Sequence, residues 1–120
     1  MADAMLKIEN LNERIKDFGG NEVVLYDAEG QSLPKDQQFT FGNILLNLLT
    51  RLKPETPQQI IRARKLGEKI AGAMDGAGEC EVSVSEMAML REAAKQNGPT
   101  YTIPVLGYAM LCLGMSETEG

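Results

Sequence analysis

The leucine-rich run from Phe39 to Leu52 constrains the fold more than any other part of the chain. Its large apolar residues recur at steps of three and four, which places their side chains on one face of a helix. They are Phe41, Ile44, Leu45, Leu48, Leu49 and Leu52. A helix with such a face needs a partner surface, so the run predicts a folded core. Thr40 is placed to cap this helix, and Pro54 ends it.

The composition favours one mainly helical domain. Hydrophobic residues make up 43% of the 120 residues, which is too much for a disordered chain. Aromatic residues make up only 5% and tryptophan is absent, so aliphatic residues and methionine must supply the core, and these lean towards helices. We expect a single domain over residues 1–120, with residues 1–4 and 115–120 frayed at its ends.

Further helices are expected over about 57–74, from a cap at Ser83 or Ser85 to about residue 96, and over about 102–113. The first begins at a clear signal, the capping residue Thr56 followed by proline. Its apolar stripe comprises Ile60, Ala63, Leu66 or Gly67, Ile70 and Met74. The second has two rival caps, Ser83 and Ser85, and Ser83 has capping-box spacing to Glu86. It is expected to bury Met87, Leu90 and Ala94.

The β content is expected to be small. Residues 79–84 alternate with period two, as in a half-buried strand. Residues 22–33 are typical of a hairpin around the turn Asp27–Gly30, where the glycine is free to take a positive φ. Residues 5–18 fit a helical face or an opening strand at Met5–Ile8, and the helix is favoured.

These elements predict an α+β fold: one mainly helical domain with four to five helices and a small antiparallel β element. The strand near Val82 is expected to pair with the hairpin at 23–33, and no internal repeat is expected. The expected core consists of Leu45, Leu48, Leu49, Ile60 or Ile61, Ile70, Val82, Leu90, Leu106 and Leu113.

The residues argue against catalysis. Histidine, the commonest general base and metal ligand, is absent. The seventeen carboxylates are dispersed along the chain, and glycines 72, 76 and 78 follow a helix, whereas phosphate loops precede one. The two cysteines, Cys80 and Cys112, have no metal or redox spacing and are expected to be buried free thiols. We therefore expect no enzyme, no cofactor and no metal site.

The charge and the apolar runs bear on location and partners. The net charge is −5, which works against nucleic acid and anionic membranes. The longest apolar run, 103–115, is shorter than the ~18 residues that a membrane span needs, and the N-terminus lacks a signal-peptide profile. A cytoplasmic protein without a membrane partner is expected.

The first candidate contact surface is basic. Between Arg51 and Lys69 six basic residues face two acidic ones, a local charge of +4, and Arg62, Lys65 and Lys69 share one helical face. Such a face could bind phosphate or an acidic partner. The ordinary solvated side of an amphipathic helix is favoured over nucleic-acid binding, because no aromatic residues are interleaved for stacking.

The second candidate surface belongs to the predicted helix 102–113, which is apolar on two faces. One face holds Leu106, Ala109, Met110 and Leu113, and the other holds Val105, Tyr108 and Cys112. Such a helix is either central in the core or shared with another chain, and the residues leave both open. In the second case Val105, Tyr108 and Cys112 form the apolar contact, and the three basic residues above form its rim.

Three motifs over roughly residues 22–113 resemble small proteins encoded by tailed bacteriophages and prophages. They are the threonine-x-glycine opening of the leucine-rich helix at 39–49, the helix end Lys65–Ile70, and the strand-to-helix junction Cys80–Leu90. The motifs are structural, so they assign no functional residue.

The resemblance implies a non-catalytic phage structural or virion-assembly accessory protein that forms oligomers. It would act in the cytoplasm of a bacterial host or on the virion, and bind itself, another phage protein or a host protein. The alternative is a phage-encoded inhibitor or regulator of a host system, which contacts nucleic acid or an enzyme that acts on nucleic acid.

Overall fold

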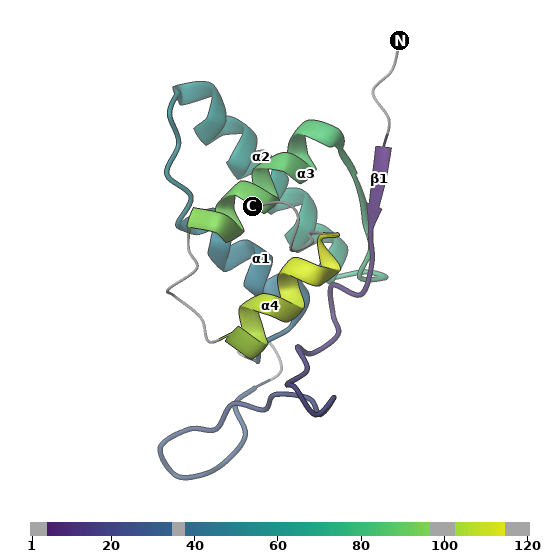
Figure 1. Cartoon of the computed structure of the whole chain (residues 1–120), viewed down its shortest axis with the longest axis vertical. Coiled ribbons are helices and arrows are strands. Elements are labelled where there is room, and N and C mark those ends of the chain that lie inside the picture. Colours follow the sequence, from purple (N-terminus) through teal and green to yellow (C-terminus); the bar gives the residue numbers. More distant parts are fainter. Residues whose placement is uncertain (1–4, 35–37, 97–102, 115–120) are drawn as a thin grey trace.

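The computed structural model describes residues 5–34, 38–96 and 103–114. Within them the chain forms four α-helices and a two-stranded antiparallel sheet, so the predicted α+β class is confirmed (Figure 1). In chain order the elements are β1 (Met5–Ile8), α1 (Phe41–Thr50), α2 (Pro57–Met74), β2 (Cys80–Ser83), α3 (Val84–Gln96) and α4 (Ile103–Cys112). The ends expected to fray, 1–4 and 115–120, lie outside the described residues.

α1 is the central helix and contacts α2, α3 and α4. Its predicted apolar face is buried from Phe41 to Leu49. Thr40 caps the helix as predicted, because its Oγ1 accepts a 3.1 Å hydrogen bond from the Asn43 N–H. The predicted core is otherwise confirmed at Leu45, Leu48, Leu49, Ile70, Val82, Leu90, Leu106 and Leu113.

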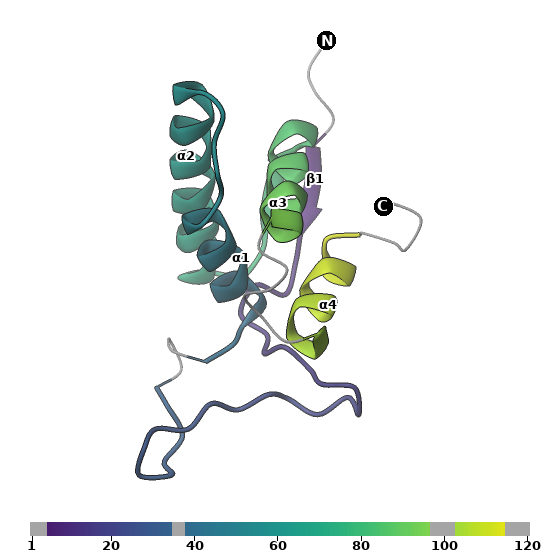
Figure 2. The same cartoon turned by 60° about the vertical axis from the view of Figure 1, so that its left-hand side comes forward.

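α2 begins at Pro57 behind its predicted threonine cap. Leu66 and Ile70 are the residues that it buries fully. The prediction that Ile60 or Ile61 joins the core is wrong, because both side chains are more than half exposed. Figure 2 shows why: α2 extends well beyond α1, so its first turns have little to pack against.

β1 and β2 pair in antiparallel register, with Leu6 opposite Val82 and Ile8 opposite Cys80. The prediction that the Val82 strand pairs with the hairpin at 23–33 is therefore wrong. Val82 and Ile8 are both buried, so this small sheet contributes directly to the core beside the helices.

The favoured helix over 5–18 is also wrong, and the alternative strand at Met5–Ile8 is correct. Asn10 has a positive φ of 64°, which a right-handed helix does not contain. The Leu11 N–H donates to the distant Gly78 carbonyl at 2.9 Å instead of to a helical neighbour. Long-range hydrogen bonds therefore override the local apolar spacing.

A projecting arm, residues 9–34 and 38–40, lies at one end of the helical body (Figure 2). Its first turn runs from Asp17 to Asn21. Asp17 Oδ1 accepts hydrogen bonds from the Gly19 and Asn21 N–H groups at 2.9 and 3.0 Å, and Gly20 has a φ of 81°. Aspartate commonly holds its own backbone in this way, and glycine tolerates this φ at little cost.

The second turn repeats the first ten residues later. Asp27 Oδ1 accepts from the Glu29 and Gln31 N–H groups at 2.9 Å each, and Gly30 has a φ of 83°. The turn predicted at Asp27–Gly30 is thus confirmed, although its flanks form one isolated bridge in place of regular strands. The two turns share an aspartate and a glycine at the same positions and have the same backbone geometry.

The backbone pairs around the two turns carry the same ten-residue offset. Lys16 bridges Glu22 as Tyr26 bridges Ser32. The matching hydrogen bonds run from Val23 N–H to the Ile15 carbonyl and from Leu33 N–H to the Leu25 carbonyl, each 2.9 Å. We call residues 15–23 and 25–33 the first and second hairpins of the arm.

Gln38 joins the second hairpin to the last part of the arm, residues 38–40. Its side chain is only 1% exposed. Its Oε1 accepts from the Leu25 N–H at 2.7 Å, and its Nε2 donates to the Leu25 and Leu33 carbonyls at 3.1 and 2.9 Å. The side-chain amide thus donates and accepts hydrogen bonds as a backbone amide in a neighbouring strand would.

Gln38→Ala should lower the free energy of unfolding by about 1–3 kcal/mol, because it leaves a part-buried Leu25 N–H without its partner. Gln31→Ala is the matched control, since Gln31 is exposed in the same hairpin. Urea denaturation and amide hydrogen exchange at Leu25 measure the effect. Equal stability and equal exchange in the two variants would contradict this role for Gln38.

Candidate functional site

α4 packs on α1 and α3, and one of its sides is buried there. The buried residues on that side are Val105, Leu106 and Ala109, followed by Leu113 just beyond the helix. Arg91 on α3 fixes the end of α4, because its Nε and Nη2 donate to the Leu113 carbonyl at 3.0 and 2.9 Å. The guanidinium thus satisfies a carbonyl that the end of a helix leaves without an internal partner.

The outward side of α4 carries no charged residue. Ile103 is 77% exposed and Leu111 is 72% exposed, and with Gly107 they recur at steps of four along one face. Tyr108 and Cys112 continue this surface around the helix. We call Ile103, Gly107, Tyr108, Leu111 and Cys112 the α4 surface. A solvated helix face normally carries charged or polar side chains, so this surface is unusual.

The structure divides the three apolar contact residues expected from the sequence. Val105 is only 4% exposed and faces the core, so it is not available to a partner. Tyr108 is half-buried and Cys112 is exposed. The correction follows from the rotation of α4: its apolar residues cover the whole circumference, so the sequence could not show which side meets α1.

Sequence reasoning missed Ile103 and Leu111, the most exposed large apolar residues of α4. Their spacing of eight, with Gly107 between them, was a sufficient signal for a third face. It was overlooked because the two other apolar faces already accounted for most of the helix. These two residues replace Val105 in the candidate site.

Both cysteines are free, and they differ in exposure. Cys80 is half-buried and Cys112 is exposed, so the expectation that both thiols are buried is wrong, although both are free as expected. Burial raises the pKa of the Cys112 thiol, and the Glu13 carboxylate on the arm raises it further against the lowering effect of a hydrogen bond with Tyr108. A thiol with a raised pKa is a poor nucleophile near neutral pH.

The three basic residues expected to form a rim all lie on the exposed side of α2, but they differ in their partners. Lys69 Nζ lies 2.9 Å from Glu86 Oε1 and 3.3 Å from the Glu81 carbonyl, so it ties α2 to the β2–α3 junction. Arg62 lines a hollow of about 400 Å³ between α2 and α3, and Lys65 is exposed. Neither lies on α4, so the structure does not combine the basic rim with the α4 surface.

Glu86 is the other half of the Lys69 contact and closes the predicted capping box. Its Oε1 accepts from the Ser83 N–H at 2.8 Å, and its own N–H donates to Ser83 Oγ at 3.1 Å. Burial by itself would raise the pKa of this carboxyl. The hydrogen bonds from Ser83 and the ammonium of Lys69 outweigh it and lower the pKa below the ordinary 4.5.

Two grooves flank α2. The α2–α3 hollow is lined in part by Lys53, Glu55, Arg62 and Glu92, all of which are exposed, so it is a solvated groove. A catalytic acid–base pair is usually recognised by desolvation and a close charge partner. No ion pair joins these four side chains in the described part of the chain.

The second groove beside α2, which we call the α1–α2 groove, has a volume of about 420 Å³ and is mainly apolar. Among the residues that line it are Leu46, Leu49, Leu52, Ile60, Ala63, Arg64 and Glu68.

Among residues 5–34, 38–96 and 103–114, no group of three or more acidic or cysteine side chains is placed to hold a metal ion. None of the helices that the structure describes has both the length and the apolar character to cross a membrane. Comparison of the chain with protein-family models, curated proteins and solved structures finds no match. The likeness to phage proteins therefore remains an expectation from the sequence motifs.

Glu86→Ala should lower the free energy of unfolding at pH 7 by about 1–2 kcal/mol, because it removes the box contact and the Lys69 partner. A lowered folded-state pKa means that the carboxylate stabilises the fold above its unfolded pKa. This contribution is lost as the pH falls through the folded pKa. The stabilities of wild type and variant should therefore converge below about pH 4.5.

Glu86→Gln is the control, since its amide oxygen can still accept the Ser83 N–H. Urea unfolding between pH 7 and pH 3 measures both variants. A Glu86→Ala deficit that is as large at pH 3 as at pH 7 would show that the carboxylate charge contributes nothing.

Proposed function

We propose that the protein is a non-catalytic interaction protein that self-associates through the α4 surface, as a phage structural or assembly accessory. The observation that carries self-association is the uncharged outward side of α4, with Ile103 and Leu111 both more than 70% exposed. The phage context rests on the sequence motifs alone.

The energetics favour a partner for this surface. Full burial of a large aliphatic side chain is worth about 1.5–3 kcal/mol, so two such residues on each copy contribute several kcal/mol. In a symmetric pair the same patch serves both copies, which doubles the gain without any further sequence requirement. A second copy is therefore the simplest partner for an uncharged helix face.

α4 alone is too small for a whole interface. Ten residues of helix span about 15 Å, whereas a stable interface buries about 800 Å² on each partner. The neighbouring arm lies close enough to add to the interface, because the Glu13 carboxylate on the arm helps to raise the pKa of both Tyr108 and Cys112. We infer an interface centred on α4, with the part of the arm around Glu13 at its edge.

The alternative role, a regulator that contacts nucleic acid, has less support. Lys69 and Arg64 are each paired with a glutamate on the protein itself. The remaining basic residues near them lie in a chain of net charge −5. Two of the six cations between Arg51 and Lys69 are thus neutralised, and the net negative charge of the chain opposes phosphate, so this surface supports nucleic-acid binding weakly.

Leu111→Lys should weaken self-association at least tenfold, because it places a charge in the centre of the proposed contact. Ile61→Lys is the control, since Ile61 is similarly exposed but lies on α2. Sedimentation velocity over a concentration series measures both variants against wild type. Equal dissociation constants for Leu111→Lys and wild type would overturn the α4 surface as the contact.

A further inference from the structure

The arm is strongly acidic, and most of its carboxylates form no ion pair with a described residue. Over residues 9–34 six acidic side chains face two basic ones, a local charge of −4. Within the described residues, Glu9 is the only one of the six in an ion pair, with Lys7. Glu22 and Glu29 are exposed on the two hairpins. The arm therefore presents a surface with an excess of negative charge.

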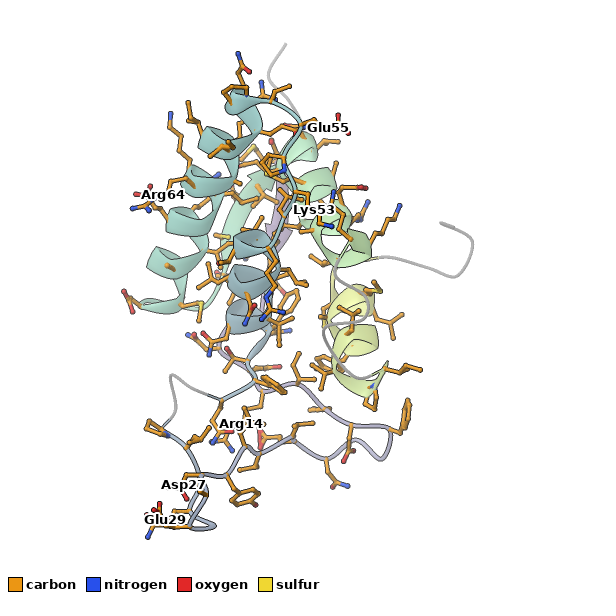
Figure 3. All side chains as sticks on the ribbon, turned by 90° about the vertical axis from the view of Figure 1, so that its left-hand side faces the viewer. Arg14, Asp27, Glu29, Lys53, Glu55 and Arg64 are labelled. Carbon is orange, nitrogen blue, oxygen red and sulfur yellow. The ribbon has the colours of Figure 1, made fainter. Side chains whose placement is uncertain are left out.

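The opposite end of the molecule is basic. Residues 51–69 carry a local charge of +4, and four of their cations form no ion pair with any described residue: Arg51, Lys53, Arg62 and Lys65. Figure 3 shows the two ends far apart along the long axis, with Asp27 and Glu29 below and Lys53 and Arg64 above. The two groups of charges therefore lie apart within one copy, along the 52 Å longest extent of the molecule.

The basic end also contains an apolar opening. The α1–α2 groove has leucine side chains on its α1 side and Ile60 and Ala63 on its α2 side. Ile60 is 56% exposed, so the apolar lining reaches solvent. Arg64 and Glu68 lie along the same groove and pair with each other at 3.0 Å. The groove is thus apolar inside and is bordered by the Arg64–Glu68 ion pair.

The acidic arm carries a side chain suited to the α1–α2 groove. Phe18 is 83% exposed, more than any other large apolar residue that the structure describes. It lies at the tip of the first hairpin, directly after Asp17, whose carboxylate fixes the turn. Because the backbone of this turn is already fixed, binding need not order it, so Phe18 is a favourable anchor.

We propose that copies of the chain also bind head to tail, with the Phe18 tip of one copy in the α1–α2 groove of the next. Arg51 and Lys53 do not line this groove, but both adjoin its lining residue Leu52 in the chain, so the carboxylates of the arm then lie beside the groove near these two cations of the acceptor copy. This inference rests on the proposed self-association and adds a second, different contact to it. The contact joins two unlike surfaces, so it extends into a ring or a filament instead of closing as a pair.

Phe18→Ala tests the anchor. The second hairpin already has alanine, Ala28, at the equivalent position, so the variant turn is expected to keep its fold. We expect at least a tenfold weaker head-to-tail contact by sedimentation velocity on the full chain. A dissociation constant and a distribution of oligomers equal to wild type would overturn the proposal.

Charge reversal tests the partner. Glu22→Lys with Glu29→Lys should weaken the contact, and so should Arg51→Glu with Lys53→Glu. A mixture of the two double variants should associate at least tenfold more tightly than either alone, because a basic arm then meets an acidic acceptor end. A mixture no tighter than its components would exclude a second copy as the occupant of the groove.

Salt separates this contact from the α4 surface. Raising the salt concentration from about 50 to about 500 mM should weaken the head-to-tail contact, because exposed charges are screened. Association that survives Phe18→Ala but fails in Leu111→Lys would overturn the head-to-tail contact alone. Salt-sensitive association that survives Leu111→Lys but is lost in Phe18→Ala would overturn only the proposed contact through the α4 surface. A wild-type protein that is monomeric at low salt would overturn both proposed contacts.

Discussion

The structure depends on how the arm satisfies the start of α1. The first N–H groups of a helix have no partner inside it. Here the Phe41 N–H donates to the Glu13 carbonyl at 2.9 Å, and the Gly42 N–H donates to the Leu11 carbonyl at 2.8 Å. A Cβ atom on residue 42 would meet that second carbonyl at 2.9 Å, so glycine is required there. The central helix and the arm are therefore one unit, and the threonine-x-glycine motif has a structural cause.

Elements with local signals were predictable from the sequence. α1, α2 and α3 each begin at a side-chain cap, and a cap needs only residues within one turn of itself. The second turn of the arm was equally local, because aspartate and glycine define it without help from the rest of the chain. Prediction failed where the decisive partner lay far away in sequence. β1 finds its partner at residues 80–83, and Leu11 finds its acceptor at Gly78.

The candidate site was only partly predictable for a related reason. The apolar character of the helix at 103–112 was evident, and so was its need for a partner. Which side would be buried depended on where α1 and α3 meet it, and a helix that is apolar all round carries no preference. Val105 and Leu111 are equally apolar, yet one lies in the core and the other in solvent. Exposure here is a property of packing and not of composition.

The two proposed contacts draw on different physics, and this difference shapes what an assembly could be. A symmetric contact through α4 closes on itself and gives pairs. A contact between the arm and the α1–α2 groove leaves a free arm and a free groove at the ends, so it continues. The charges that favour it lie at opposite ends of a 52 Å molecule and are screened by salt. A chain with both contacts therefore forms pairs at high salt and extended assemblies at low salt, so ionic strength can control growth without a change in fold.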